Sequence, residues 1–312
     1  MPVHAQTSPP AAGEPHAQPT ATLGAPFGRD PVFVARSLNI SSRAVRYFSP
    51  EVRGLENVPT TGPALLVGNH SGLMYLPDFW VAFDAITHLR GTEAPFYMLT
   101  YDMLMKFPGV RTLLGRLGAV PASPANAEAA LQQGAAVIVY PGGDWEACRS
   151  WRDRDVIDFN DHKGFVRLAL RTGVPVIPVV AHGVQHAVAI IARGDRVAHA
   201  LQLSRTPLRM NVLPLVIGPP FGIAHMPLAT PLPMPATIRV EFLPALDWKD
   251  RDPTQADNDE VVDALYAETL STMRAALDRL RAETPHPLLT GSGHLLRDLE
   301  HGMVHTAQRL IP

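Results

Sequence analysis

The sequence contains a single cysteine, Cys148, no excess of positive charge and no long run of apolar residues. One cysteine excludes an internal disulfide and is typical of a chain in a reducing compartment. A formal net charge of −2 provides no overall basic field, so nucleic acid is not an expected partner. No stretch of about 18 uninterrupted apolar residues occurs, so no membrane span is predicted. We therefore expect a cytoplasmic protein, with any membrane contact peripheral.

Proline is abundant, at 31 residues, and unevenly placed. Residues 1–28 are rich in Pro and Ala and have almost no large apolar side chains, so this segment is predicted to be disordered. Residues 29–285 are expected to form one domain, and 286–312 a C-terminal helical tail with a helical pattern at 295–310. The segment 213–235 is apolar but too rich in proline for regular structure, and we expect a loop that faces lipid or an acyl chain.

Apolar runs alternate with helical patterns along the rest of the chain. This alternation predicts an α/β domain with a mainly parallel central sheet flanked by helices. Strands are predicted at 64–67, 96–99, 136–140, 174–180 and 238–242, and helices at 31–48, 79–89, 109–117, 124–133, 164–171 and 258–282. The first helix is amphipathic.

Two loops with reactive residue types follow two of these strands. The stretch VGNHSGLMYLPD at 67–78 places His70 just after one strand, with Asp78 further along. A histidine can accept a proton near neutral pH, and a carboxylate can hold its ring in one orientation. Asp78 is equally suited to begin the helix that follows it. Gly142 and Gly143 follow another strand, and because ligands bind at the carboxyl ends of strands, both loops are candidates for one site. The glycines are also typical of a tight turn.

The order of these motifs resembles the glycerolipid acyltransferases, and most closely the branch of monoacylglycerol and type-2 diacylglycerol acyltransferases. The resemblance covers about residues 45–250. It rests on GNHSG after a strand, on YPGG followed by Glu146 and Ala147, and on the stretches HKGFVRLALRTG, VPVIPVV and TIRVEFLP.

This resemblance implies an enzyme that transfers a fatty acyl group from acyl-CoA to a lipid hydroxyl, with no metal and no cofactor. His70 would be the general base and an aspartate would orient it. The usual aspartate position holds Tyr75, so Asp78 becomes the expected partner and Glu146 the alternative. Glu146 is also expected to contact the substrate, as are Gly142 and Gly143. Backbone N–H groups of Gly142 and Gly143 could stabilise the oxyanion.

The substrates follow from further positions in the same region. Arg149 and Lys163 either bind CoA phosphates or lie on a solvated surface. The arginine of the phosphate-binding members is missing after Gly143, which favours a neutral glycerolipid or a long-chain alcohol as the acceptor. A lysophospholipid or glycerol-3-phosphate type of acyltransferase remains the enzymatic alternative. A non-catalytic lipid-binding protein on the same fold is the alternative from another class.

Two other patterns do not support a site. His182 and His186 have the spacing of half a zinc site, but the glutamate of a zinc protease is missing between them. Ser71 lies in GNHSG, but the Gly-x-Ser-x-Gly pattern of a hydrolase elbow would require glycines in place of Asn69 and Leu73.

Contact with the inner face of a membrane is expected from two segments. One is the helix at 31–48, which carries Arg36, Arg43 and Arg46 beside apolar residues, and the other is the apolar segment 213–235. The alternative is that both segments pack on the core of the protein.

Overall fold

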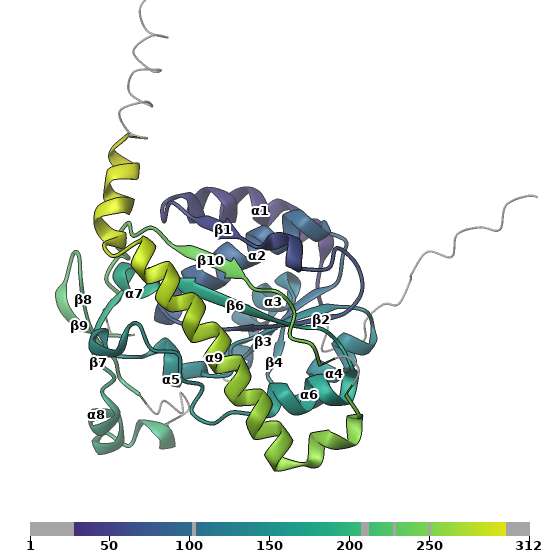
Figure 1. Cartoon of the computed structure of the whole chain (residues 1–312). Coiled ribbons are helices and arrows are strands. Elements are labelled where there is room, and N and C mark those ends of the chain that lie inside the picture. The colour runs from purple at the N-terminus through teal and green to yellow at the C-terminus, as the bar shows by residue number, and fades with distance from the viewer. Residues whose placement is uncertain (1–27, 102–103, 207–211, 227–228, 249–250, 298–312) are drawn as a thin grey trace, which may run out of the picture.

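A computed structural model describes residues 28–101, 104–206, 212–226, 229–248 and 251–297. At its centre lies a seven-stranded sheet. The strand order is β1-β10-β6-β2-β5-β3-β4 (Figure 1), and a second, three-stranded sheet has the order β7-β8-β9. The predicted disordered segment lies outside the described residues, apart from its last residue.

The bounds of the elements agree closely with most of the predicted ranges. The strands are β1 Glu51–Arg53, β2 Ala64–Gly68, β3 Phe96–Thr100, β4 Ala119–Pro121, β5 Ala136–Val139, β6 Val176–His182, β7 Ala189–Ala192, β8 Leu215–Gly218, β9 Gly222–His225 and β10 Arg239–Phe242. The helices are α1 Pro31–Arg46, α2 Pro77–Arg90, α3 Pro108–Leu117, α4 Pro124–Gln132, α5 Gly143–Ala147, α6 Gly164–Thr172, α7 Val184–Ala187, α8 Asp195–Ala200 and α9 Asp259–Glu283.

The prediction of a mainly parallel sheet is confirmed. Strand β2 lies between β6 and β5, parallel to both, and β3 is parallel to β5 and β4. Only the β10–β6 pairing is antiparallel. All residues of β2 and β6 are buried, as expected for strands covered by helices on both faces. The carboxyl ends of β2, β5 and β6 therefore lie at the same edge of the sheet.

Helices cover the two faces of the sheet in separate groups. Side chains of α1, α2 and α3 pack with alternate sheet residues such as Leu66 and Ile138, whereas α4, α6 and α9 pack with Leu65 and Val137. Figure 1 shows α9 crossing the face opposite to α1 and α2. Helices therefore cover each face of the sheet through apolar contacts, and polar loops lie at the ends of the strands.

Helix α1 was expected either to contact a membrane or to pack on the core of the protein. Asp30 caps it by accepting a hydrogen bond from the Phe33 N–H at 3.0 Å. Its apolar stripe, formed by Val34, Leu38 and Val45, is buried on the core. For these three side chains the alternative of packing on the core therefore holds, whereas Val32 and Ile40 of the same helix are exposed, and contact of this helix with a membrane stays a prediction. Its three predicted arginines, Arg36, Arg43 and Arg46, are exposed.

The segment 213–235 contains more regular structure than predicted. Strands β8 and β9 form an antiparallel hairpin in which Leu215 pairs with His225 and Gly218 with Gly222. The prolines lie outside these four-residue strands, with Pro219 and Pro220 in the connecting turn, so they remove no ladder hydrogen bond. The prediction of an irregular loop is wrong for both strands.

The described part of the C-terminal tail is helical over 287–297, and the rest of the pattern predicted at 295–310 lies outside the described residues. The Thr237 N–H donates to the Pro287 carbonyl at 2.9 Å, so the tail begins against the body of the domain. Among the helices of the described residues, none has the length and apolar character needed to cross a bilayer.

Candidate active site

Two loops from neighbouring strands meet at the carboxyl edge of the sheet. Val67 of β2 pairs with Val139 of β5, so the residues that follow the two strands are brought together. His70 lies just beyond β2 and Tyr140 just beyond β5. Their rings pack with centroids 4.5 Å apart and an interplanar angle of 32°. The predicted proximity of the two loops is confirmed.

His70 and Asp78 are hydrogen bonded. The His70 Nδ1 and Asp78 Oδ2 atoms lie 2.9 Å apart. The same carboxylate accepts hydrogen bonds from the backbone N–H of Ser71 at 3.1 Å and of Phe79 at 2.9 Å, and its side chain is 2% exposed. Asp78 lies in the first turn of α2. With Nδ1–H directed at the carboxylate, Nε2 carries the lone pair that can accept a proton.

The longer spacing between His70 and Asp78 has a conformational basis. Gly72, Leu73 and Leu76 all have positive φ, at 86°, 54° and 47°. These left-handed residues fold the loop back, so that α2 begins with Asp78 beside the imidazole. Tyr75, which occupies the usual aspartate position, donates its hydroxyl hydrogen bond to the Pro231 carbonyl instead. The loop therefore uses the later carboxylate for His70 and Tyr75 for packing.

Opposing effects set the pKa of His70. Burial lowers the pKa of the imidazole, whereas the charge and hydrogen bond of Asp78, together with the charge of Glu146, raise it. The net result is a pKa above the usual histidine value. The protonated ring is therefore well stabilised, as the cationic intermediate of general base catalysis requires.

The side chain of Glu146 binds the backbone of the loop that carries His70. The carboxylate is 1% exposed; its Oε2 accepts from the His70 N–H at 3.2 Å, and its Oε1 accepts from the Asp158 N–H at 3.1 Å. Burial raises the pKa of Glu146 to about 8, and Arg149 and the two N–H donors lower it in part. Of the two carboxylates proposed as partners of the His70 ring, Asp78 makes the contact, and Glu146 holds the main chain.

The two predicted basic residues occupy different places. Arg149 is buried, and its Nη2 donates to Glu146 Oε1 at 3.4 Å and to the Asp158 carbonyl at 3.1 Å. Lys163 Nζ lies 2.9 Å from Asp161 and 2.7 Å from Asp263 of α9, so the structure does not bring it to His70. Both cations are already paired with carboxyl groups of the protein.

The glycine pair forms a turn, and only half of the expected oxyanion donors remain. The Gly143 N–H donates to the Tyr140 carbonyl at 3.0 Å, so it is unavailable to a substrate. The N–H of Gly142 has no acceptor within the described part of the chain. A Cβ atom at Gly142 would lie 2.2 Å from Cγ of Glu146, so the absence of a side chain leaves room for this carboxylate.

Gly142→Ala is expected to lower the free energy of unfolding by about 1–3 kcal/mol, because the new methyl group displaces the buried Glu146 side chain. Turnover per folded molecule should fall as well, since Glu146 then releases the His70 backbone. Gly115→Ala in α3 is the matched control: no atom lies within 4 Å of its Cβ position. It should stabilise the helix by about 0.5–1 kcal/mol. Urea unfolding and acyl-transfer assays would check both; equal stability of the two variants would contradict the packing argument.

Three further residues of the site were missed by sequence reasoning. Asn69 exchanges two hydrogen bonds with the backbone of Ala181 in β6, at 3.0 and 2.7 Å, and Gln185 donates to the Ser71 hydroxyl at 3.2 Å. These bonds anchor the loop that carries His70. Tyr140 packs on the imidazole, and Gly68 leaves space for its ring. For Tyr140, the only sequence signal of a role in the site was its position between a strand and a Gly-Gly turn.

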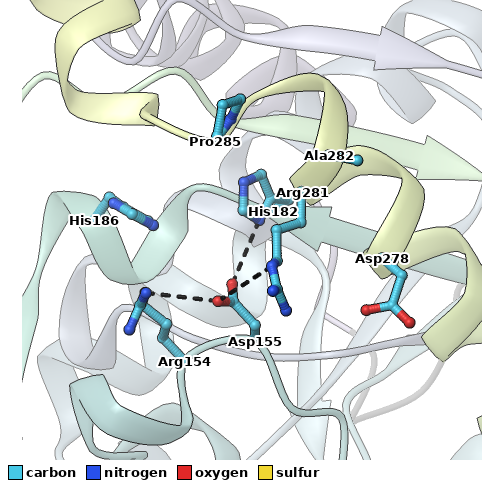
Figure 2. Close-up of a pocket in the computed structure, with 8 residues that line it drawn as sticks. All are labelled: Arg154, Asp155, His182, His186, Asp278, Arg281, Ala282 and Pro285. Carbon is cyan, nitrogen blue, oxygen red and sulfur yellow. Dashed lines mark ion pairs between the residues drawn. The ribbon is translucent and has the colours of Figure 1, made fainter.

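A separate concavity of about 430 Å³ contains the two other histidines singled out in the sequence. Figure 2 shows it between the end of β6, the loop with Asp155 and the last turn of α9. His182 and His186 have ring centroids 6.0 Å apart, and burial lowers the pKa of both, that of His186 to about 4. Across the described residues, no group of three potential ligands could hold a metal ion.

Comparison with known proteins relates the residues of this site to one protein family. Residues 49–182, which contain His70, Asp78 and Glu146, match the family model described as acyltransferase. This part of the chain is similar to the acyltransferase family. An uncharacterized protein of Mycobacterium tuberculosis is 26% identical over 261 residues, which is 82% of this chain and 69% of that protein.

Two similar proteins have functional names. The bovine "DGAT1/2-independent enzyme synthesizing storage lipids" is 27% identical over 43% of this chain, and "Phytyl ester synthase 2, chloroplastic" of Arabidopsis thaliana is 29% identical over 41%. The alignments cover 39% and 18% of those two proteins. Among solved structures, the 1-acyl-sn-glycerophosphate acyltransferase PlsC of Thermotoga maritima matches with a TM-score of 0.48 and 19% identity, over 80% of each chain.

Proposed function

We propose that this protein transfers a fatty acyl group from acyl-CoA to the hydroxyl of a lipid acceptor, with His70 as the general base. The observation that carries the proposal is the hydrogen bond between His70 Nδ1 and Asp78 Oδ2 at the carboxyl edge of an acyltransferase-family sheet. It supports an imidazole with a fixed tautomer and with Nε2 directed away from the carboxylate.

The reaction proceeds in the following way. His70 Nε2 accepts the proton of the acceptor hydroxyl while its oxygen attacks the thioester carbonyl carbon. Asp78 stabilises the imidazolium that forms. The carbon–sulfur bond then breaks, the ester is released, and the CoA thiolate leaves and takes the proton from His70. We assign the developing oxyanion to the N–H of Gly142, since Gly143 is engaged in the turn.

The proposal is tested by incubating the purified protein with a long-chain acyl-CoA and a lipid alcohol. Release of CoA thiol and formation of the ester by mass spectrometry should rise together with protein concentration. Hydrolysis of the thioester without ester formation would contradict the transfer reaction. No turnover with any acceptor would favour a lipid-binding protein, whereas the His70–Asp78 contact supports the enzyme.

A neutral acceptor is favoured by the state of the two candidate cations. Arg149 is buried against Glu146, and Lys163 bridges two aspartates, so neither is free to bind a phosphate. The names of the bovine and Arabidopsis relatives point to storage lipids and phytyl esters, which supports the same choice.

Monoacylglycerol or a long-chain alcohol is therefore expected to be acylated at least as fast as lysophosphatidic acid at equal concentration. Competition assays with mixed acceptors, read by mass spectrometry, would measure the ratio. The control is Lys163→Ala, which removes a cation paired with Asp161 and Asp263 and should leave this ratio unchanged. A strong preference for the phosphorylated acceptor that disappears in this variant would establish the lysophospholipid alternative.

A further inference from the structure

The chain between β6 and β10 builds a small sheet with one buried and one exposed face. Ile190 of β7 pairs with Val216 of β8, and both side chains are buried. The neighbouring pair across β8 and β9, Ile217 and Ile223, lies on the opposite face, where the two side chains are 45% and 62% exposed. Phe221 in the hairpin turn is 57% exposed. Such a cluster of large apolar side chains on a surface marks an interaction site.

The buried face of this sheet packs against the loop that carries the catalytic pair. Ile190 and Val216 share an apolar cluster with Leu73, which lies between His70 and Asp78. Tyr75 of the same loop donates a hydrogen bond to the Pro231 carbonyl, in the segment that follows β9. In Figure 1 the strands β7, β8 and β9 lie beside α7, beyond the end of β6. The exposed face is thus connected to the site by a single layer of strands.

The charge of this region is mostly positive, and Asp195 at the start of α8 is paired with Arg193. From residue 196 to residue 240 the sequence contains no aspartate or glutamate, and its only ionisable side chains are those of arginine and histidine. Arg196 in α8 and Arg205 just after it are exposed, and Val197 and Leu201 between them are exposed as well. Apolar side chains next to arginines fit an anionic lipid surface, because burial of apolar area and attraction to head groups add.

We propose that the outer face of the β7–β8–β9 sheet, with Ile217, Phe221 and Ile223 as its centre, docks on an anionic lipid bilayer. The choice of lipid as the occupant rests on the proposed function, since an acceptor dissolved in a membrane must reach the loop that this sheet covers. Helix α1 is less suited to this contact, because Val34, Leu38 and Val45 of its apolar stripe are buried in the core. A second copy of this chain is the competing occupant.

The test is co-sedimentation with vesicles of phosphatidylcholine and phosphatidylglycerol. The triple variant Ile217→Ser, Phe221→Ser, Ile223→Ser should bind on the order of tenfold or more weakly, because three large apolar side chains no longer enter the boundary. Arg196→Glu with Arg205→Glu, a second variant that leaves the sheet intact, should also bind more weakly, and wild-type binding should decrease as salt is added. The control variant carries Ile40→Ser in α1 and Leu113→Ser in α3, which are also exposed, and it should bind like the wild type.

The outcomes separate docking from catalysis. The triple variant with substitutions at Ile217, Phe221 and Ile223, here called the hairpin variant, should still acylate a soluble short-chain alcohol, whereas His70→Ala should lose turnover and keep vesicle binding. The proposal would be overturned if the hairpin variant bound vesicles as well as the wild type does. It would also be overturned if vesicle binding were lost only in the control variant. A wild-type dimer in sedimentation velocity that the hairpin substitutions dissociate without changing vesicle binding would overturn it as well, since the face would then contact a second copy.

Discussion

His70→Ala is expected to reduce acyl-transfer turnover by about 10²- to 10⁴-fold, because the acceptor hydroxyl loses the group that removes its proton. The chain should still fold. Asp78 keeps two of its hydrogen bonds, those from the N–H groups of Ser71 and Phe79, so no buried carboxylate is left without donors. The ring contact with Tyr140 is lost, and the free energy of unfolding should fall by about 1–3 kcal/mol.

His88→Ala is the matched control for this substitution. His88 lies at the end of α2, contacts Asp84 of the same helix and is largely exposed. The same change of side chain should therefore leave turnover and stability close to those of the wild type. Turnover per folded molecule is measured after the folded fraction has been determined by circular dichroism. If the His70 variant remained within a few-fold of the wild type, the base would have to be sought elsewhere.

The sequence predicts the inner strands β2, β5 and β6 well because they are continuous apolar runs, whereas the three-residue edge strands β1 and β4 were not predicted. In β2 and β6 all side chains are buried, so no alternation is needed to recognise them. The site loops follow from the same strands, since residues beyond two neighbouring carboxyl ends must lie close together. The residue types raise the pairing of His70 with Asp78, and the family resemblance supports the role of His70 but places Tyr75 at the usual aspartate position. The physical basis of the pairing is the left-handed conformation of Leu73 and Leu76, which no local propensity indicates.

The features that sequence reasoning missed depend on contacts between distant residues. Lys163 resembled a phosphate ligand until the structure placed it beside Asp263, on a helix that follows much later in the chain. Glu146 was expected to contact the His70 ring or a substrate, but it binds the backbone of His70 and Asp158. The strands β8 and β9 are four residues long, which is too short for an alternating pattern to be recognised among prolines.

Asp78→Asn is expected to lower turnover by about 10²- to 10⁴-fold while the acid limb of the pH profile moves to lower pH. The amide has one acceptor oxygen where the carboxylate has two. If the oxygen faces Phe79, the amide NH₂ faces His70 Nδ1 and favours the tautomer with the proton on Nε2, which cannot act as a base. If the oxygen faces His70, the NH₂ opposes the Phe79 N–H, and the imidazolium still lacks its counter-charge.

The direction of the pH shift follows from the causes of the His70 pKa. His70 must be neutral to accept a proton, so kcat/KM in the wild type should rise with pH through a midpoint above about 6.5, the usual value for histidine. Without the charge of Asp78, burial becomes the dominant influence and lowers the pKa. The midpoint of the variant should therefore lie at lower pH, with a lower plateau above it.

A purely structural Asp78 would behave differently in the same experiment. Loss of the bonds to Ser71 and Phe79 would lower the free energy of unfolding, but turnover per folded molecule and the pH midpoint would stay unchanged. Asp84→Asn in α2 is the control, because Asp84 also contacts a histidine of its own helix, His88, far along the helix from the loop. Asp84→Asn should change neither turnover per folded molecule nor the pH midpoint. The combination of a lower plateau with a midpoint shifted to lower pH is thus specific for a carboxylate that orients His70 and stabilises its charge.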